Sequence, residues 1–167
     1  MSQDNKPLVV ETEFPVRYAE TDAMGVVHHA NYLVYFEVGR CQLMRDMGSD
    51  YAHIEGDGYQ LPVTELKVRF VGSLCFGDRV KIRTWMEENR SRRLTFAYEV
   101  IHPETEAILV SGFTSHVWTD KKGNVTRVPE FWSSLFNKIT ERILYGSFFI
   151  RRIQRPYDFN SCTLSYR

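Results

Sequence analysis

Hydrophobic residues between Asn31 and Met47 recur at helical spacing and predict one long helix in the first third of the chain. Tyr32, Phe36, Leu43 and Met47 lie on a single stripe of this helix. Further apolar residues make its first half hydrophobic on most sides, and a helix of that kind is normally buried. We therefore expect other elements of the chain to wrap around it.

After the helix, hydrophobic and polar residues alternate in four segments, and this period of two predicts β-strands. The segments are residues 61–70, 79–86, 93–101 and 107–118. Turn-forming residues separate them, and one polar face per strand is typical of an antiparallel sheet that is covered on one side. Residues 11–18 can supply another strand before the helix, and Pro15 directs that strand to a sheet edge.

This order of elements predicts an α+β fold in which a curved antiparallel sheet wraps around one long central helix. We expect the four later strands to follow one another as a meander, and a second helix to run from Pro129 to Arg142. A single sheet leaves its edges and part of one face open, so we also expect the protein to associate with itself.

The chain divides into a domain at residues 1–140 and a C-terminal extension at residues 141–167. The extension has five arginines against two acidic residues. Two interpretations stay open: a segment that docks on an acidic partner, or an additional packed hairpin or poorly ordered end.

The composition is that of an ordinary globular protein, with 43% hydrophobic and 25% charged residues. Lys+Arg and Asp+Glu number 21 each, which excludes a basic field that would attract nucleic acid or anionic lipid. The odd number of cysteines does not favour a disulfide framework, and the polar N-terminus is unlike a secretory signal. No apolar run reaches the roughly 18 residues that span a bilayer. We therefore expect a cytoplasmic protein without a membrane span.

The candidate catalytic and binding residues concentrate in residues 17–40, where the predicted strand is followed by the long helix. A helix start presents unpaired N–H groups and the positive end of the macrodipole, which would stabilise the oxyanion of an ester or thioester carbonyl. Asp22 could act there as nucleophile or as a base that activates water, and Gly25 would let the backbone approach the ligand. From the residues alone, Asp22 can equally be a turn or capping residue.

No metal site or cofactor is expected. His28 and His29 are adjacent, but the sequence has neither an HExxH motif nor a cysteine cluster to supply further ligands.

Residues 17–40 closely resemble the signature of the 4-hydroxybenzoyl-CoA thioesterase-like family, in which an Asp-x-x-Gly-x-Val run leads into the central helix. The similarity continues through LKVRF, the FGD turn at residues 76–78 and the GxxxHVW stretch at residues 112–118, and it covers roughly residues 12–135. The resemblance implies the hotdog fold. It also implies a homo-oligomer, either a dimer or a dimer of dimers (a homotetramer), with active sites at the subunit interface.

The resemblance also implies roles for individual residues. Asp22 matches the catalytic aspartate, which acts as nucleophile or general base. The backbone N–H of His29 matches the donor that polarises the thioester carbonyl, and Tyr18 matches an aromatic residue that helps shape the site. Gly25, Val27 and Asn31 match other positions of the oxyanion and substrate-binding segment. Other hotdog branches use a glutamate of the central helix as an acid, and Glu37 could be taken for it. We interpret Glu37 here as structural.

The phosphates of coenzyme A require arginine or lysine. Arg90, Arg92 and Arg93 lie in a turn and are candidates, although each can equally be a solvated turn residue.

The expected function is that of an acyl-CoA thioesterase, which hydrolyses a small aromatic or short-chain acyl-CoA to the free acid and CoA. The abundance of aromatic residues favours a flat aryl group slightly. One alternative is a non-catalytic module that binds acyl-CoA or a protein partner. Another is a hotdog hydratase, which pairs the aspartate with a histidine five residues later, but here that position is Val27.

Overall fold

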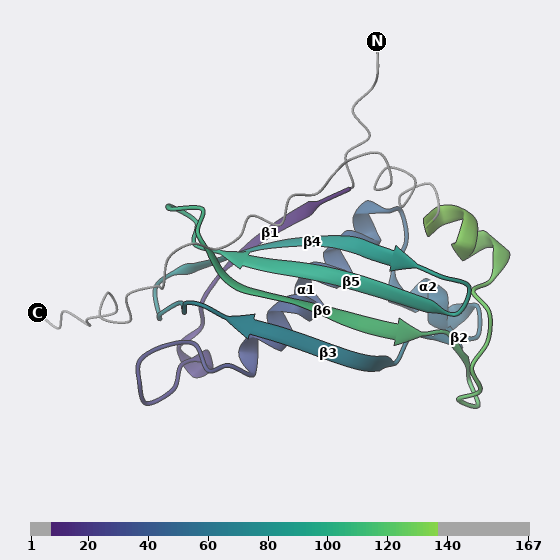
Figure 1. The fold of residues 1–167 in the computed structure, drawn as a ribbon, viewed down its shortest axis with the longest axis horizontal. Helices are drawn as coiled ribbons and strands as arrows, with labels where there is room; N and C mark the ends of the chain where they lie inside the picture. Colours follow the sequence, from purple (N-terminus) through teal and green to yellow (C-terminus); the bar gives the residue numbers. More distant parts are fainter. Residues whose placement is uncertain (1–7, 137–167) are drawn as a thin grey trace, which may run out of the picture.

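The structure is a computed structural model that describes residues 8–136. Five antiparallel strands form a sheet in the order β1-β4-β5-β6-β3, and α1 lies across one face of it (Figure 1). The elements are β1 (Val10–Pro15), a 3-10 turn (Tyr18–Glu20), α1 (Asn31–Asp46), α2 (Tyr51–Gly56), β2 (Tyr59–Gln60), β3 (Val63–Phe70), β4 (Arg79–Asn89), β5 (Arg93–Ile101), β6 (Ile108–Val117) and β7 (Thr119–Asp120). The predicted α+β hotdog arrangement is confirmed.

The predicted apolar stripe of α1 is its buried face. Tyr32, Phe36 and Leu43 are almost completely buried, and the ring of Phe36 stacks on Tyr98 of β5 with centroids 4.4 Å apart. Gly39 lies where α1 crosses β4, and a Cβ at this position would approach Thr84 Oγ1 to 2.3 Å. Glycine therefore allows the helix to pack closely on the sheet.

The sheet leaves part of α1 exposed in a single chain. Leu33, Val34 and Val38 are 36–47% exposed. The reason is that α1 packs mainly against β1, β4 and β5. β3, at the edge of the same sheet face, therefore stays partly exposed.

The strand positions agree with the prediction, but the meander does not include all four strands. β4, β5 and β6 are consecutive neighbours, whereas β3 pairs with β6 at the far edge and β4 has β1 as its other neighbour. The connection from β3 to β4 is not a hairpin, because it crosses the start of α1. There the carbonyl of Leu74 accepts the N–H of Val27, and the N–H of Leu74 donates to the Tyr32 hydroxyl.

β3 is an open edge strand: within residues 8–136 it has no strand on its outer side. Its apolar residues Val63, Leu66 and Phe70 are 44–51% exposed. The other edge is β1, where Pro15 was predicted to lie and where it ends the strand.

Some elements of the structure were not predicted from the sequence, and some predictions fall outside the described residues. α2 and the short β2–β7 pair were not predicted. Residues 130–136 are helical, and the rest of the helix predicted from Pro129 to Arg142, with the whole extension at residues 141–167, lies outside the described residues. Cys41 is a free thiol. None of the described helices is long and apolar enough to cross a membrane.

Candidate active site

Residues 20–29, here called the site loop, form a short hairpin directly before α1. Thr21 and Val27 face each other as an antiparallel bridge, and the N–H of Asp22 donates to the carbonyl of Val26 at 2.9 Å. The turn closes through the N–H of Gly25, which donates to the carbonyl of Asp22 at 2.9 Å. Gly25 has a φ of 77°, a conformation that favours glycine. This hairpin fixes the backbone that carries Asp22.

The Asp22 side chain has one oxygen occupied and one available. Oδ1 accepts the N–H of Met24 at 2.8 Å, so Asp22 does take the turn role that its residue type allows. The second carboxylate oxygen accepts no hydrogen bond from any described residue. The side chain is half-buried at the surface of the loop. It is therefore both oriented and accessible.

The backbone N–H of His29 donates to no atom of the described chain, although its neighbours are all paired. The N–H of His28 donates to the carbonyl of Glu20, that of Ala30 to His28 Nδ1, and that of Asn31 to the carbonyl of His28. His29 precedes the first turn of α1, where the helix dipole adds partial positive charge. A free amide in this position is suited to bind a carbonyl oxygen or an oxyanion. The imidazole of His29 is exposed and lies beside that of His28.

Glu20 organises the site loop, and the sequence reasoning missed it. Its backbone carbonyl accepts both the N–H of His28 at 2.9 Å and the Asn31 side-chain amide at 2.7 Å. Its carboxylate is 4% exposed and accepts the backbone N–H of Arg17, the Arg17 guanidinium and the Tyr35 hydroxyl at 2.7–2.8 Å. Glu20 thus ties both arms of the loop to α1.

The electrostatics of Glu20 agree with this role. Burial by itself would raise the pKa of its carboxyl, but the hydrogen bonds from Arg17 and Tyr35 outweigh burial and hold the pKa below its usual value. Burial, followed by the neighbouring carboxylate of Glu20, raises the pKa of Tyr35 well above its ordinary value. Glu20 therefore stays ionised while Tyr35 stays a donor. The only sequence signal for this pair was the helical pattern that contains Tyr35. Such a pattern does not reveal that the Tyr35 hydroxyl donates to Glu20.

The remaining predicted residues support the loop or border it. Val27 is 3% exposed and packs into the core, and Asn31 uses its amide to hold the Glu20 carbonyl. Tyr18 is 75% exposed, and its ring meets that of Phe76 edge-on at 5.5 Å. These two rings lie on the solvent side of the loop.

Arg90, Arg92 and Arg93 are not brought to Asp22 within one chain. The site loop adjoins the start of β4, because Val26 bridges to Cys75 and the N–H of Val16 donates to the carbonyl of Asp78. The arginines follow the other end of β4, which is eleven residues long, so they lie on the order of 30 Å away. Arg90 forms an ion pair with Glu88, and Arg93 with Glu65.

A cavity of about 180 Å³ lies beside α1 on the open β3 side. Leu33 and Phe36 of α1 form one wall, and Val63 and Leu66 of β3 form the other. Leu33 is the third residue of α1, so the cavity begins within about one helical turn of the helix start. Apolar walls next to a free amide suit an acyl group.

The far end of this cavity is polar. The buried Arg40 pairs there with Glu37 and lies 2.8 Å from Nε2 of His116, which in turn contacts the Thr114 hydroxyl. Burial and the charge of Arg40 lower the pKa of His116 to about 4, so this histidine is neutral at physiological pH. Glu37 therefore serves as the partner of a buried cation, in agreement with its structural interpretation.

Comparisons with known proteins indicate the family of this chain. The profile of the thioesterase-like superfamily matches residues 16–139. The putative acyl-CoA thioesterase YneP of Bacillus subtilis is 37% identical over 114 residues, which cover 68% of this chain and 82% of that protein. The matched profile region includes the site loop, α1 and every strand after β1.

Two of the solved structures that are similar to this chain cover most of it. The hypothetical protein TT1821 from Thermus thermophilus has a TM-score of 0.73 at 37% identity, with 77% of this chain and 98% of that chain covered. The DHNA-CoA thioesterase from Staphylococcus aureus has a TM-score of 0.77 at 29% identity, with 84% and 97% covered.

Proposed function

This chain belongs to the thioesterase-like superfamily, and from that premise we propose that it hydrolyses acyl-CoA thioesters to the free acid and CoA. The observation that carries the proposal is the pairing of two free groups in one fixed hairpin. These are the second carboxylate oxygen of Asp22 and the N–H of His29 at the start of α1. The relative YneP is named as a putative acyl-CoA thioesterase.

The geometry supports a simple sequence of events. The thioester carbonyl oxygen binds the His29 N–H, which stabilises the negative charge that develops on it. The free oxygen of Asp22 either attacks the carbonyl carbon or removes a proton from an attacking water. The carbon–sulfur bond breaks, and CoA leaves as a thiolate, so no strong general acid is needed. Water finally supplies the oxygen of the acid and the proton of the thiol.

The acyl group that we propose is small, either aromatic or short-chain. The cavity beside α1 holds about 180 Å³, close to the roughly 150 Å³ that accommodates one benzene molecule in a protein core. One similar structure is that of a DHNA-CoA thioesterase, which supports an aromatic acyl group.

We propose that the protein works as a homo-oligomer in which two β3 edges pair. The exposed apolar residues of β3 and α1 would then be covered. In an antiparallel pair the two sheets run in opposite directions. The turn with Arg90, Arg92 and Arg93 of the partner subunit would therefore lie at the end where this chain has its site loop. There it could bind the phosphates of CoA.

The non-catalytic alternative predicts CoA binding without turnover. The hydratase alternative has little support from the site, because the position of its histidine is the buried Val27.

Thiol release from butyryl-, benzoyl- and hydroxynaphthoyl-CoA tests the proposal. We expect release from at least one of them by the wild type, and a loss of 100-fold or more in kcat for Asp22→Asn with the fold retained. Asp46→Asn, which changes an exposed carboxylate at the end of α1, is the matched control and should keep wild-type activity. Hydrolysis by Asp22→Asn near the wild-type rate would refute the role of Asp22. Binding without release by the wild type would favour the non-catalytic module.

A further inference from the structure

The cavity beside α1 ends at a buried arginine that the proposed reaction does not use. Arg40 is 6% exposed and lines this cavity of about 180 Å³, together with Tyr98 and Thr114 of the sheet. Leu33 lines the cavity near the helix start and lies seven residues before Arg40 in α1. Because an α-helix rises about 1.5 Å per residue, the cavity extends about 10 Å along α1, with Arg40 at its far end.

Arg40 is held in place by three contacts. Nδ1 of His116 donates to the carbonyl of Leu61 at 3.0 Å, so Nε2 of the same ring accepts a hydrogen bond from Arg40 at 2.8 Å. The other end of the guanidinium pairs with the carboxylate of Glu37. The guanidinium carbon also lies 4.8 Å from the centroid of the Tyr51 ring. If Arg40 moved aside, it would lose a hydrogen bond, an ion pair and a cation–π contact.

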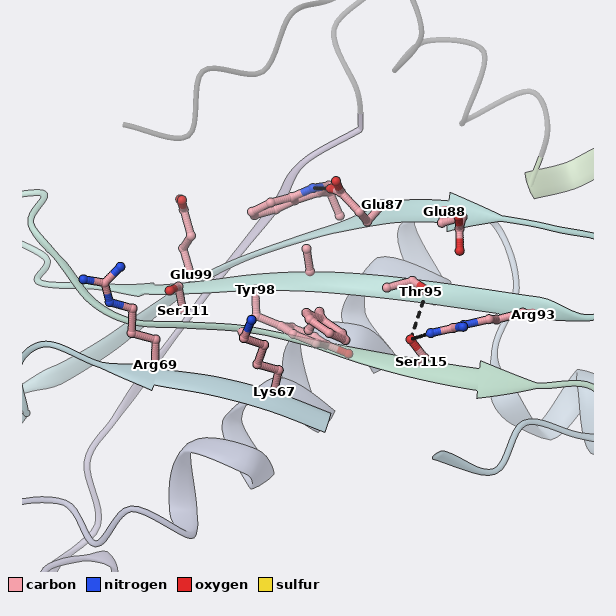
Figure 2. A pocket seen from close by; sticks show the side chains of 14 residues that line it. Lys67, Arg69, Glu87, Glu88, Arg93, Thr95, Tyr98, Glu99, Ser111 and Ser115 are labelled. Atoms are coloured by element: carbon pink, nitrogen blue, oxygen red, sulfur yellow. Dashed lines mark hydrogen bonds between the residues drawn. The ribbon is translucent and has the colours of Figure 1, made fainter. Parts of the chain in front are cut away.

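The sheet closes the cavity on the side away from α1. β5 and β6 are paired residue by residue where Tyr98 and Thr114 line the cavity. A larger hollow of about 710 Å³ lies on the opposite face of the sheet, and Figure 2 shows charged side chains such as Lys67 and Glu87 around it. Because the paired strands separate the two spaces, a long acyl group cannot extend from the cavity into this hollow.

The size and the polar end of the cavity limit the acyl groups that fit. Its volume of about 180 Å³ is close to the roughly 150 Å³ that holds one benzene molecule in a protein core. An alkyl chain longer than the cavity would contact the guanidinium of Arg40 and the carboxylate of Glu37. Such a chain would remove water or hydrogen bonds from these charges and replace neither, which is unfavourable. A short acyl group avoids this cost.

We propose that Arg40 is a specificity-determining residue that limits the length of the acyl group. This inference rests on the proposed hydrolysis of acyl-CoA and assigns its length limit to one side chain. The wild type should act on butyryl-CoA and discriminate against the longer octanoyl-CoA. Removal of the guanidinium would extend the cavity towards the ring of Tyr51, which Arg40 now covers, and should relax the limit.

The fold should tolerate the loss of this cation. His116 is neutral at physiological pH, because burial and the charge of Arg40 lower its pKa to about 4. The side chain of Glu37 is 55% exposed, so its carboxylate stays hydrated without its partner. Neither neighbour would become a buried unpaired charge, which is what makes the loss of one partner of a buried ion pair strongly destabilising. Methionine is a suitable replacement, because its flexible side chain fills irregular space.

The substitution Arg40→Met tests the proposal, with kcat/KM measured for thiol release from butyryl-, hexanoyl- and octanoyl-CoA. In the wild type we expect kcat/KM for octanoyl-CoA to lie about tenfold or more below that for butyryl-CoA, and Arg40→Met should raise the octanoyl-to-butyryl ratio about tenfold or more. Arg40→Lys should retain most of the limit, because it keeps a cation at the end of the cavity. Arg45→Met, the same change at an exposed position of α1, is the matched control and should keep the wild-type ratio.

Binding measurements separate this proposal from the proposed hydrolysis. In an Asp22→Asn background, calorimetry gives the Kd of butyryl- and octanoyl-CoA without turnover, and Arg40→Met should shift their ratio towards octanoyl-CoA. Should Arg40→Met fail to fold, Arg40→Gln provides the same test, because it removes the charge and keeps an amide donor for His116. A wild type that releases no thiol would contradict the proposed hydrolysis alone. Unchanged length ratios after loss of the Arg40 charge, or a wild type that prefers octanoyl-CoA, would overturn the role of Arg40.

Discussion

At the scale of single residues, the shape of the site loop depends on the carboxylate of Glu20, which has no part in the proposed reaction. Glu20 is buried, ionised and bound by Arg17 and Tyr35, and its backbone holds His28 and Asn31. The sequence predicts Asp22 and His29 as site residues, because their spacing matches a known signature. It does not predict Glu20, because only the folded chain shows that Tyr35 points at it.

Tyr35→Phe tests this network. The Glu20 carboxylate would lose one donor in a buried position, so we expect the free energy of unfolding to fall by about 1–3 kcal/mol. Thiol release should fall several-fold, because the site loop loses a tie to α1. Tyr59→Phe is the matched control. The Tyr59 hydroxyl forms no hydrogen bond within the described chain, so stability should change by less than about 0.5 kcal/mol. Equal effects of the two substitutions would contradict the proposed role of Glu20.

His116 predicts a pH dependence of stability. Its pKa is about 4 in the folded chain and about 6.5 when unfolded, so the unfolded state binds the proton first as the pH falls. The contribution of His116 to the free energy of unfolding is fully present above pH 6.5 and is lost as the pH falls towards 4. This contribution is about 3 kcal/mol in total. Urea unfolding at pH 7.5, 6 and 5 should show this loss in the wild type and a flatter dependence in His116→Gln. Parallel pH profiles would show that His116 is not the group responsible.

At the scale of elements, the sequence predicts the positions of strands better than their neighbours. Alternation depends on which residues face the core, and it located β5 to the residue. The order of strands depends on where the connections run. Residues 72–78 have turn chemistry. Leu74 nevertheless hydrogen-bonds with Val27 and Tyr32 at the start of α1, so β3 and β4 lie apart. A local pattern does not contain such a contact over more than 40 residues.

The crossing of α1 over β4 provides a test of helix packing. Gly39→Ala gains up to about 1 kcal/mol of helix propensity, but its Cβ would approach Thr84 Oγ1 to 2.3 Å. Overpacking of this kind costs about 1–3 kcal/mol, so we expect a net loss of stability in thermal or urea unfolding. Gly56→Ala in α2 is the matched control, since nothing lies within 4 Å of its Cβ. It should be neutral or stabilising. Stabilisation by both substitutions would show that the crossing can relax.

At the scale of the whole molecule, one chain leaves two apolar surfaces uncovered. Leu33, Val34 and Val38 of α1 and Val63, Leu66 and Phe70 of β3 are exposed. Of these, Leu33, Val63 and Leu66 line the cavity beside α1. The sequence predicted self-association because a single sheet has open edges. It could not show which surfaces are open, because α1 is apolar nearly all round and its uncovered side is set by tertiary packing.

Leu66→Glu tests the pairing of β3 edges. Leu66 is 44% exposed in one chain, and a charge there would be buried by a partner. We expect fewer copies per assembly and a higher KM for the acyl-CoA, because the arginines of the partner subunit would be lost. Val125→Glu, at an exposed position away from the edge, should change neither quantity. A normal assembly in Leu66→Glu would exclude pairing through this edge.

The connection between β3 and β4 also ties the site loop to a later part of the chain. The carbonyl of Leu74 completes the bonding of Val27, and its N–H fixes the Tyr32 ring, so the segment that carries Asp22 waits for a strand connection synthesised some fifty residues later. A chain that ends before this connection would lack the backbone partner that shapes its own site loop. We therefore expect the site loop to take this shape only after residue 74 has joined the fold.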